Sequence, residues 1–343
     1  MTLFQSDRNT KIITFFIVFI VLSIFAGTRT MIVGRDYEEY YRLFSFFPTF
    51  KSIEGEAFVL YEPTILLLPQ LSKFLFGSDV YLNATFLLFS ILGVGTKLYS
   101  IQKSKFFFLS TIIYCSYLFY SQEMITIRAG VACGLFLLAI DDLENKNDKR
   151  FFLKIGIAYL FHYSSFIFIF VWIIERFNIR YKLLYIGIGF SLIIALLKIN
   201  ILTLLKLDAV FPKVKIYLAL LESESDVPVN ILNFRILFSL LFLALFVYKI
   251  ELVKNLRMFP LLFKVHLLSI ILFFTLSPTA MVFSLRIFDM LSVGQILLYP
   301  FVIYLFKEKV IGYLIILIFC IINFYYIFFI SGWFVNGYES WLF

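Results

Sequence analysis

Residues 11–27 read KIITFFIVFIVLSIFAG, and residues 28–41 read TRTMIVGRDYEEYY. The first run is apolar after its lysine and reaches the roughly 17 residues that a helical membrane span needs at minimum. The second run is polar and contains Arg29, Arg35 and Asp36. The sequence therefore predicts a transmembrane helix followed by a polar loop, with Lys11 holding the preceding end in the cytoplasm.

The rest of the chain has the same character as this first helix. Hydrophobic residues make up 62% of the sequence and charged residues only 15%. The apolar runs are continuous, whereas the strands of a membrane barrel alternate apolar and polar residues, so a closed barrel is excluded. The longest polar stretches are about 30 residues, too short for a separate soluble domain. These features predict an all-α polytopic membrane protein with a single membrane domain over residues 1–343.

Charge and cysteine content exclude several other classes. The net charge of +8 is expected from cytoplasmic loops and contacts with lipid head groups, so nucleic acid is not an expected partner. Cys115, Cys133 and Cys320 lie within apolar runs without Cys-x-x-Cys spacing, which predicts packing residues. We expect no disulfide framework, no metal site and no cofactor.

Eleven apolar segments are candidates for spanning or re-entrant helices. They cover residues 11–27, 62–76, 80–98, 105–121, 125–140, 151–175, 182–198, 231–249, 261–277, 281–305 and 310–331. Simple alternation of eleven spans cannot place every basic loop in the cytoplasm, as the positive-inside rule requires. One of those basic loops is the group of Lys97, Lys103 and Lys105.

Two adjustments restore a consistent topology. Segment 62–76 is short and begins with Glu62-Pro63, so we expect a juxtamembrane helix within an outer loop from 28 to 79; proline is favoured at the first helical position. Segment 151–175 is expected to be two short helices that turn at residues 161–165. The basic loops then become cytoplasmic, and residues 28–79, 199–230 and the C-terminal tail face outside.

With this topology, most ionisable residues inside apolar segments enter from the outer face. A charge at the bilayer centre costs about 2.5–3.5 kcal/mol on insertion scales, so each needs a partner or a water-filled cavity. These residues are Arg128, His162, Arg235 and Arg286, which join Arg29, Arg35, Asp36 and Glu62 of the first outer loop. Arg128 is expected about five residues below the outer end of its helix, roughly 7–8 Å. It has no acid at helical spacing, so a ligand or a carboxylate from another helix is the expected partner.

A structural role competes with a functional one at several of these positions. Arg286 and Asp289 are three residues apart and can neutralise each other on one helix. Arg235 can extend to the outer head groups, and Asp36 can cap the helix that begins at Tyr37. His162 can be a core histidine.

Several arginines with one or two acids at the outer leaflet suit a pyrophosphate-linked lipid. Arginine forks bind phosphate oxygens through charge-assisted hydrogen bonds of about 1.5–3 kcal/mol each. They also stabilise the charge that develops on a pyrophosphate leaving group. A nearby carboxylate can take the proton of an attacking sugar hydroxyl.

Four stretches resemble, in order and spacing, the EpsG/Wzy-type family of bacterial polysaccharide polymerases. They are Arg29 with Val33–Tyr40, Tyr61-Glu62-Pro63, Ile127–Ala132 and Phe161–Ser164. The resemblance covers roughly residues 20–175, and the second half matches only in helical character and around Arg286. The chain departs from the family at Arg35, where a Gly-Thr-Asp pattern is frequent, and at Ala129, where glutamine is frequent. The first-loop acid and the proline-led helix also resemble GT-C glycosyltransferases, which implies a GT-C-like fold.

The resemblance implies a polymerase that joins undecaprenyl-pyrophosphate-linked oligosaccharide units at the outer face of the bacterial cytoplasmic membrane. O-antigen, capsule and exopolysaccharide all remain open as its product. Further expected partners are membrane lipids, a chain-length-regulating co-polymerase and the repeat-unit flippase. The predicted base is Asp36, with Glu62 and His162 as alternates. The predicted pyrophosphate ligands are Arg128 and Arg286, supported by Arg29, Arg35, Tyr37 and Arg235.

Three other classes of function are alternatives: transport, a different transfer reaction and a structural role. A flippase for the same lipid would carry polar residues through the whole membrane depth and often an inverted repeat. A ligase or another GT-C transferase would differ in its donor and acceptor, which no residue reveals. A structural scaffold would leave the one-sided arginines unexplained.

Overall fold

The computed structural model describes residues 8–34, 36–46, 61–206, 229–279, 281–334 and 337–342. In these ranges the chain forms helices joined by turns and loops, and its only β-type pairing is an isolated bridge between Arg29 and Ser340. The predicted all-α class is therefore confirmed. The chain forms two compact units, a first unit of Met1–Phe166 with Glu308–Phe343 and a second unit of Ile167–Lys307.

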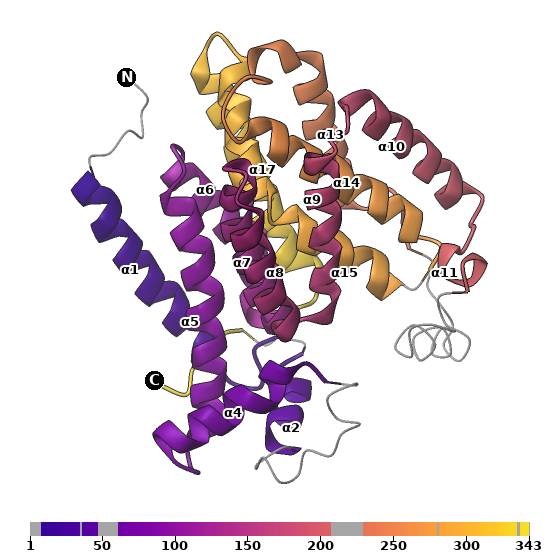
Figure 1. The fold of residues 1–343 in the computed structure, drawn as a ribbon. Coiled ribbons are helices and arrows are strands. Elements are labelled where there is room, and N and C mark those ends of the chain that lie inside the picture. Colours follow the sequence, from indigo (N-terminus) through magenta and orange to yellow (C-terminus); the bar gives the residue numbers. More distant parts are fainter. Residues whose placement is uncertain are drawn as a thin grey trace. The chain divides into compact units, whose positions relative to one another are not determined.

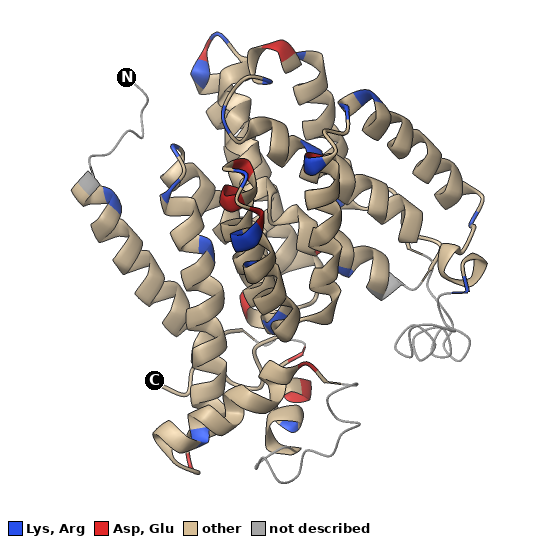
Figure 2. Ribbon diagram, in the orientation of Figure 1, with Lys and Arg blue, Asp and Glu red and all other residues tan. Residues whose placement is uncertain are grey.

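Four helices of the first unit lie side by side (Figure 1). They are α1 (Arg8–Gly27), α5 (Tyr81–Gln102), α7 (Ile127–Glu144) and α8 (Asp148–Phe161). Helix α5 contacts α1, α7 and the shorter helix α4 (Pro63–Phe76), while α2 (Tyr37–Phe46) contacts α4 and α5. Figure 2 shows the charged residues of this unit mainly toward the helix ends, with long uncharged stretches between them.

The connection between α5 and α7 is itself helical but irregular. It consists of α6 (Phe107–Ile113) and the two π-helices η2 (Tyr114–Leu118) and η3 (Tyr120–Ile125). Helix α17 (Lys309–Tyr325), which continues as the π-helix η8 (Tyr326–Ile330), contacts α6 and η2. Turns of π-helix inside longer helices occur frequently at functional sites.

The second unit is built around α14, which contacts α9, α10, α13, α15 and α16. Its helices are η4 (Tyr163–Ile167, at the boundary), α9 (Phe168–Arg176), α10 (Tyr181–Leu196), α11 (Ile201–Leu204), α13 (Phe234–Tyr248), η6 (Ile250–Leu252), α14 (Phe259–Leu276), α15 (Met281–Ser292), α16 (Gln295–Leu298) and η7 (Tyr299–Leu305). Phe273, Phe274 and Phe288 are the aromatic part of its core.

Five helical stretches in the described ranges are long and apolar enough to cross a membrane. They are Asn9–Gly27, Tyr81–Gln102, Phe259–Leu276, Phe283–Leu305 and Lys309–Ile330. Four shorter apolar helices accompany them: Pro63–Phe76, Phe107–Leu118, Tyr181–Leu196 and Phe234–Tyr248. The protein is thus a multi-pass membrane protein, and the expected count of about eleven spanning or re-entrant helices stays a prediction.

Two local predictions about helix boundaries are confirmed. Helix α4 begins at Pro63, directly after Glu62 as its N-cap residue. Helix α8 ends at Phe161, where His162 adopts an extended backbone, and the short 3₁₀-helix η4 separates it from α9. Proline at a helix start and a polar interruption within an apolar run are local signals, so the sequence alone is sufficient to locate these boundaries.

Two other predictions about charged residues are wrong. Lys97 does not belong to a solvated loop, because α5 continues to Gln102 and the Lys97 side chain is fully buried. The loop after α5 keeps Lys103 and Lys105 as its basic residues. Arg128 does not lie five residues inside its helix, because the helix is interrupted at Thr126 and α7 begins at Ile127.

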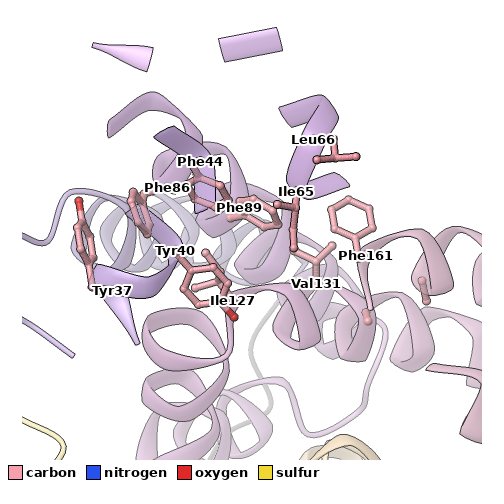
Figure 3. Packing of buried hydrophobic residues seen from close by; sticks show 12 residues of the cluster. Tyr37, Tyr40, Phe44, Ile65, Leu66, Phe86, Phe89, Ile127, Val131 and Phe161 are labelled. Carbon is pink, nitrogen blue, oxygen red and sulfur yellow. The ribbon is translucent and has the colours of Figure 1, made fainter. Parts of the chain in front are cut away.

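Aromatic rings pack α2 onto α5, and α5 onto the end of α8, in the cluster drawn in Figure 3. The Tyr37 ring stacks on Phe86 with centroids 4.0 Å apart, and the Phe44 ring stacks on Phe89 at 5.7 Å. Phe161 meets Phe89 edge to face at 6.2 Å. Such pairs contribute about 0.5–1.5 kcal/mol each beyond the burial of their area, and here they hold the loop helix α2 against the helix bundle.

The C-terminal residues also bind the loop that follows α1. The Trp341 amide donates to the Thr28 carbonyl at 2.9 Å, and the Thr30 amide donates to the Glu339 carbonyl at 3.0 Å. The Tyr338 hydroxyl donates to the Phe25 carbonyl at 2.8 Å. The end of the chain and the first loop therefore lie at the same end of the first unit, as the predicted topology requires.

Glycines allow α5 and α7 to approach closely. A Cβ atom at Gly134 would overlap the hydroxyl oxygen of Thr96 and lie 3.4 Å from the Gly93 carbonyl oxygen. Gly130 lies one turn before Gly134 on the same helix. Small residues four apart are typical of closely packed membrane helices, because they let the two backbones meet.

Gly134→Ala is therefore expected to destabilise the first unit by about 1–3 kcal/mol, the usual cost of an added methyl group in a packed interface. The measurement is the thermal unfolding midpoint in detergent. Gly156→Ala on α8 is the matched control, because no atom of the described residues lies within 4 Å of its added Cβ. An unchanged midpoint for Gly134→Ala would contradict the close α5–α7 contact.

Candidate functional site

Glu62 connects two other residues that the sequence analysis selected. It precedes α4 and makes no capping hydrogen bond with its side chain, which is 4% exposed. Its Oε2 atom forms an ion pair with Arg128, and its Oε1 atom lies 3.3 Å from His162 Nδ1. Glu62, Arg128 and His162, which come from three separate stretches of sequence, thus form one cluster.

Arg128 is the second residue of α7 and the most accessible member of this cluster, with 20% of its side chain exposed. Its guanidinium carbon lies 5.3 Å from the centre of the Tyr40 ring, and its Nε atom donates to the Tyr40 hydroxyl at 3.5 Å. The expectation that Arg128 pairs with a carboxylate from another helix is confirmed by Glu62. The guanidinium is held by an acid on one side and an aromatic ring on another, which limits its rotamers.

Two hydrogen bonds fix the start of α4 against the end of α8. The Tyr163 hydroxyl donates to the Tyr61 carbonyl at 3.0 Å, and the Thr64 hydroxyl donates to the Leu160 carbonyl at 3.1 Å. These bonds flank Glu62 and His162 in sequence. They explain why the carboxylate and the imidazole stay adjacent although 100 residues of chain separate them.

Arg29 is fully buried and has a different geometry from Arg128. Its guanidinium donates to the carbonyls of Ala26 and Met124, the latter at 2.8 Å, and lies 5.3 Å and 5.4 Å from the ring centres of Tyr37 and Phe86. Burial lowers the pKa of Arg29 to about 10, which leaves it charged at neutral pH. Arg29 therefore connects the end of α1, through Ala26, to η3, through Met124.

The other first-loop residues selected from the sequence are Asp36, Tyr37 and Arg35. Asp36 is half-buried in the turn before α2, and its carbonyl accepts from the Tyr40 amide at 3.2 Å. Tyr37 is buried in the aromatic cluster of Figure 3. Arg35 lies outside the described residues.

Arg235 and Arg286 belong to the second unit. Arg235 lies in the first turn of α13, where it forms an ion pair with Asp289 of α15. Asp289 thus has a partner on another helix, and the expected pairing of Asp289 with Arg286 on its own helix stays a prediction. The side chain of Arg235 reaches a partner on another helix, which spacing along one helix cannot predict.

A family model for EpsG proteins matches residues 12–342. The chain belongs to the EpsG family. The match covers nearly the whole chain, well beyond the four stretches that suggested it. Family membership implies a polysaccharide polymerase of the Wzy-like kind that acts on a lipid-linked oligosaccharide in membranes. No curated protein and no solved structure matches this EpsG-family chain.

The sequence analysis missed the contacts of three polar residues in the first unit of this EpsG-family protein. Tyr40 contacts Arg128, while Lys97 and Glu123 form a buried ion pair. The sequence could have indicated a buried partner for Glu123, since an acid next to an apolar run requires one. It could not have indicated one for Lys97, because a lysine near a helix end normally belongs to the basic loop that follows.

The cluster offers acid–base and anion-binding groups, without a metal-binding set. In the ranges that the structure describes, no three His, Cys, Asp or Glu residues are grouped so as to hold a metal ion. Arg128 supplies a planar pair of donors, and the Glu62–His162 contact supplies an oriented imidazole. Together these groups suit transfer of a sugar from a phosphate leaving group.

Proposed function

We propose that this EpsG-family protein is a glycosyltransferase that joins undecaprenyl-pyrophosphate-linked oligosaccharide units into O-antigen, capsular polysaccharide or exopolysaccharide. The reaction takes place at the outer face of the bacterial cytoplasmic membrane. The single observation that carries this proposal is the Glu62–Arg128–His162 cluster, in which a partly exposed arginine lies beside an imidazole paired with a carboxylate.

In the proposed reaction, a sugar hydroxyl of the acceptor unit attacks the anomeric carbon of the growing chain on the donor lipid. A new glycosidic bond forms, the bond from that carbon to the pyrophosphate oxygen breaks, and undecaprenyl pyrophosphate leaves. Arg128 binds phosphate oxygens with its two parallel donors and stabilises the charge that develops on the leaving group. Glu62 and Tyr40 hold the guanidinium in place before the donor arrives, which reduces the ordering required on binding.

The hydroxyl proton passes to the ring of His162 in this proposal. Glu62 uses one carboxylate oxygen for Arg128 and the other for His162, so it acts as the group that orients both. With Nδ1 directed at the carboxylate, Nε2 is the nitrogen that accepts the proton. This is the arrangement by which a carboxylate fixes the tautomer of a general base. Asp36, the base expected from sequence, is the alternative.

Arg286 is proposed as a second pyrophosphate ligand, with Arg29, Arg35, Arg235 and Tyr37 in supporting positions. A chain-length-regulating co-polymerase and the repeat-unit flippase are proposed partners. The support for these roles is the spacing of the residues in the sequence. For Arg29 and Tyr37 the support is indirect, since both pack in the interior of the first unit beside the loop that carries Asp36.

A flippase for the same lipid is the second candidate function. The ion pair inside the first unit argues against it, since Lys97 and Glu123 are enclosed and bind each other. The glycan made by cells lacking this protein separates the two functions. A single capped repeat unit in place of a ladder supports the polymerase, whereas loss of every surface unit supports the flippase.

The proposed orientation can be tested by thiol labelling of intact cells. Ser52→Cys and Ser223→Cys, at positions outside the described residues, are expected to react with an impermeant reagent. Asn147→Cys, at the start of α8, is expected to stay unlabelled, because the basic residues after it place this loop in the cytoplasm. The parent protein is the background control, and labelling at position 147 would overturn the topology.

A further inference from the structure

A buried ion pair in the first unit is not used by the proposed reaction. Lys97 of α5 and Glu123 of η3 are 0% and 1% exposed, and Lys97 Nζ lies 2.5 Å from Glu123 Oε1. The same oxygen accepts a hydrogen bond from the Tyr114 hydroxyl at 3.0 Å. Lys97 Nζ also donates to the Gly130 carbonyl at 2.6 Å. The pair therefore joins three elements, α5, η3 and α7, at one point.

Two glycines make room for the Glu123 carboxylate. A Cβ atom at Gly93 would overlap Glu123 Oε2, and a Cβ atom at Gly130 would lie 3.1 Å from the same oxygen and overlap the Gln122 carbonyl. Oε2 itself is buried and makes no hydrogen bond within the described part of the chain. The absence of a side chain at Gly93 of α5 and Gly130 of α7 therefore leaves the space that the Glu123 carboxylate occupies.

The segment held by the pair is the one that carries Arg128. The π-type bond from the Thr126 amide to the Ser121 carbonyl, 2.9 Å long, ends η3 and sets the break before α7. The Gly130 carbonyl, which Lys97 binds, lies two residues after Arg128 in the first turn of α7. On the other side of the break, Arg29 holds the Met124 carbonyl.

A buried ion pair is a poor source of stability, since desolvation offsets most of its attraction and an apolar pair of similar size often serves as well. An ion pair can still impose a specific geometry on the backbone when one of its side chains also binds a backbone group, as Lys97 binds the Gly130 carbonyl. The α5–α7 contact already has a close glycine interface around Gly134, so the pair is not needed to bring the helices together.

We propose that Lys97 and Glu123 are positioning residues for polymerisation, which fix the break between η3 and α7 so that Arg128 meets the pyrophosphate of the donor. This inference rests on the proposed role of Arg128. In this proposal neither Lys97 nor Glu123 contacts the substrate, and the ion pair acts only through the backbone of residues 121–130. A displacement of about 1 Å at a phosphate-binding group is enough to reduce a rate by about a hundredfold.

The test measures binding of undecaprenyl pyrophosphate to purified protein in detergent, as a Kd. Lys97→Met combined with Glu123→Gln removes both charges without leaving one unpaired, and it is made with Arg128 intact and with Arg128→Lys. The matched control is Lys103→Met with Asp141→Asn, an ion pair between the loop after α5 and α7 that is partly exposed, with its atoms 3.3 Å apart.

The double variant is expected to weaken binding about ten- to a hundredfold with Arg128 present and to cause no further weakening with Arg128→Lys, because residues that act through one group are not additive. The control pair is expected to leave the Kd unchanged in both backgrounds. Equal weakening in both backgrounds, or none in either, would overturn the inference. An Arg128→Lys protein that binds as tightly as the parent would instead overturn the proposed role of Arg128 itself.

A second variant covers the case in which the double variant does not fold. Gly93→Ala keeps both charges but forces the Glu123 carboxylate to move, so it is expected to weaken binding in the same Arg128-dependent way. If both Lys97→Met with Glu123→Gln and Gly93→Ala fail to fold while the control pair folds, the pair is a stability element and the positioning role is wrong.

Discussion

Arg128→Lys is expected to lose most polymerisation, by about 10²–10³ in rate, while the protein still inserts and folds. Lysine keeps the positive charge, so Glu62 retains a cationic partner, but the planar fork that binds two phosphate oxygens is lost. The measurement is the length distribution of polysaccharide made in cells, together with the rate in a purified assay with lipid-linked donor.

The choice of lysine matters because Arg128→Ala would leave the enclosed Glu62 carboxylate without its ion-pair partner. Breaking a buried pair in this way costs about 3–5 kcal/mol, so an inactive alanine variant would mix misfolding with loss of binding. Arg42→Lys is the matched control, since Arg42 is exposed on α2 and its ion pairs within the described residues are with Glu38 and Glu39 of the same helix. Parent-like ladders from Arg128→Lys would remove Arg128 from the pyrophosphate site.

His162→Asn is expected to reduce the rate by about 10²–10⁴, the usual contribution of a general base, with donor binding retained. Binding is retained because Arg128 keeps Glu62 and Tyr40 as its neighbours. The measurements are kcat and KM for the lipid donor with the purified protein. A fall in kcat with an unchanged KM for the donor is the expected signature of an imidazole that accepts a proton in the transition state.

Asp36→Asn distinguishes His162 from Asp36 as the general base. Asparagine caps a helix about as well as aspartate, so the turn before α2 is preserved and only the carboxylate is lost. If His162 is the base, Asp36→Asn stays active. An inactive Asp36→Asn protein beside an active His162→Asn protein would return the role to Asp36, and two active variants would exclude both residues.

Local features of the fold could be predicted from sequence. The run from residue 11 to residue 27, the proline that begins α4 and the break at His162 all depend on neighbours within a few positions. The cost of transferring each side chain into the membrane acts residue by residue, so an apolar run indicates a span whatever else the chain contains.

The candidate site could be predicted only as a set of residue types, without its contacts. The sequence selected Glu62, Arg128 and His162, but assigned the first and third as alternates to Asp36. It selected Arg29 as a ligand, whereas the structure encloses this side chain among the carbonyls of Ala26 and Met124.

The sequence by itself determined that this is an all-helical, multi-pass membrane protein of the EpsG family with an arginine and acid cluster after its first helix. Only the tertiary structure decided which charges meet. Glu62 pairs with Arg128 across 66 positions, Glu123 pairs with Lys97 across 26, and Asp289 pairs with Arg235 across 54. The reason is physical: a buried charge must find an opposite charge nearby, and what lies nearby is set by how the helices pack.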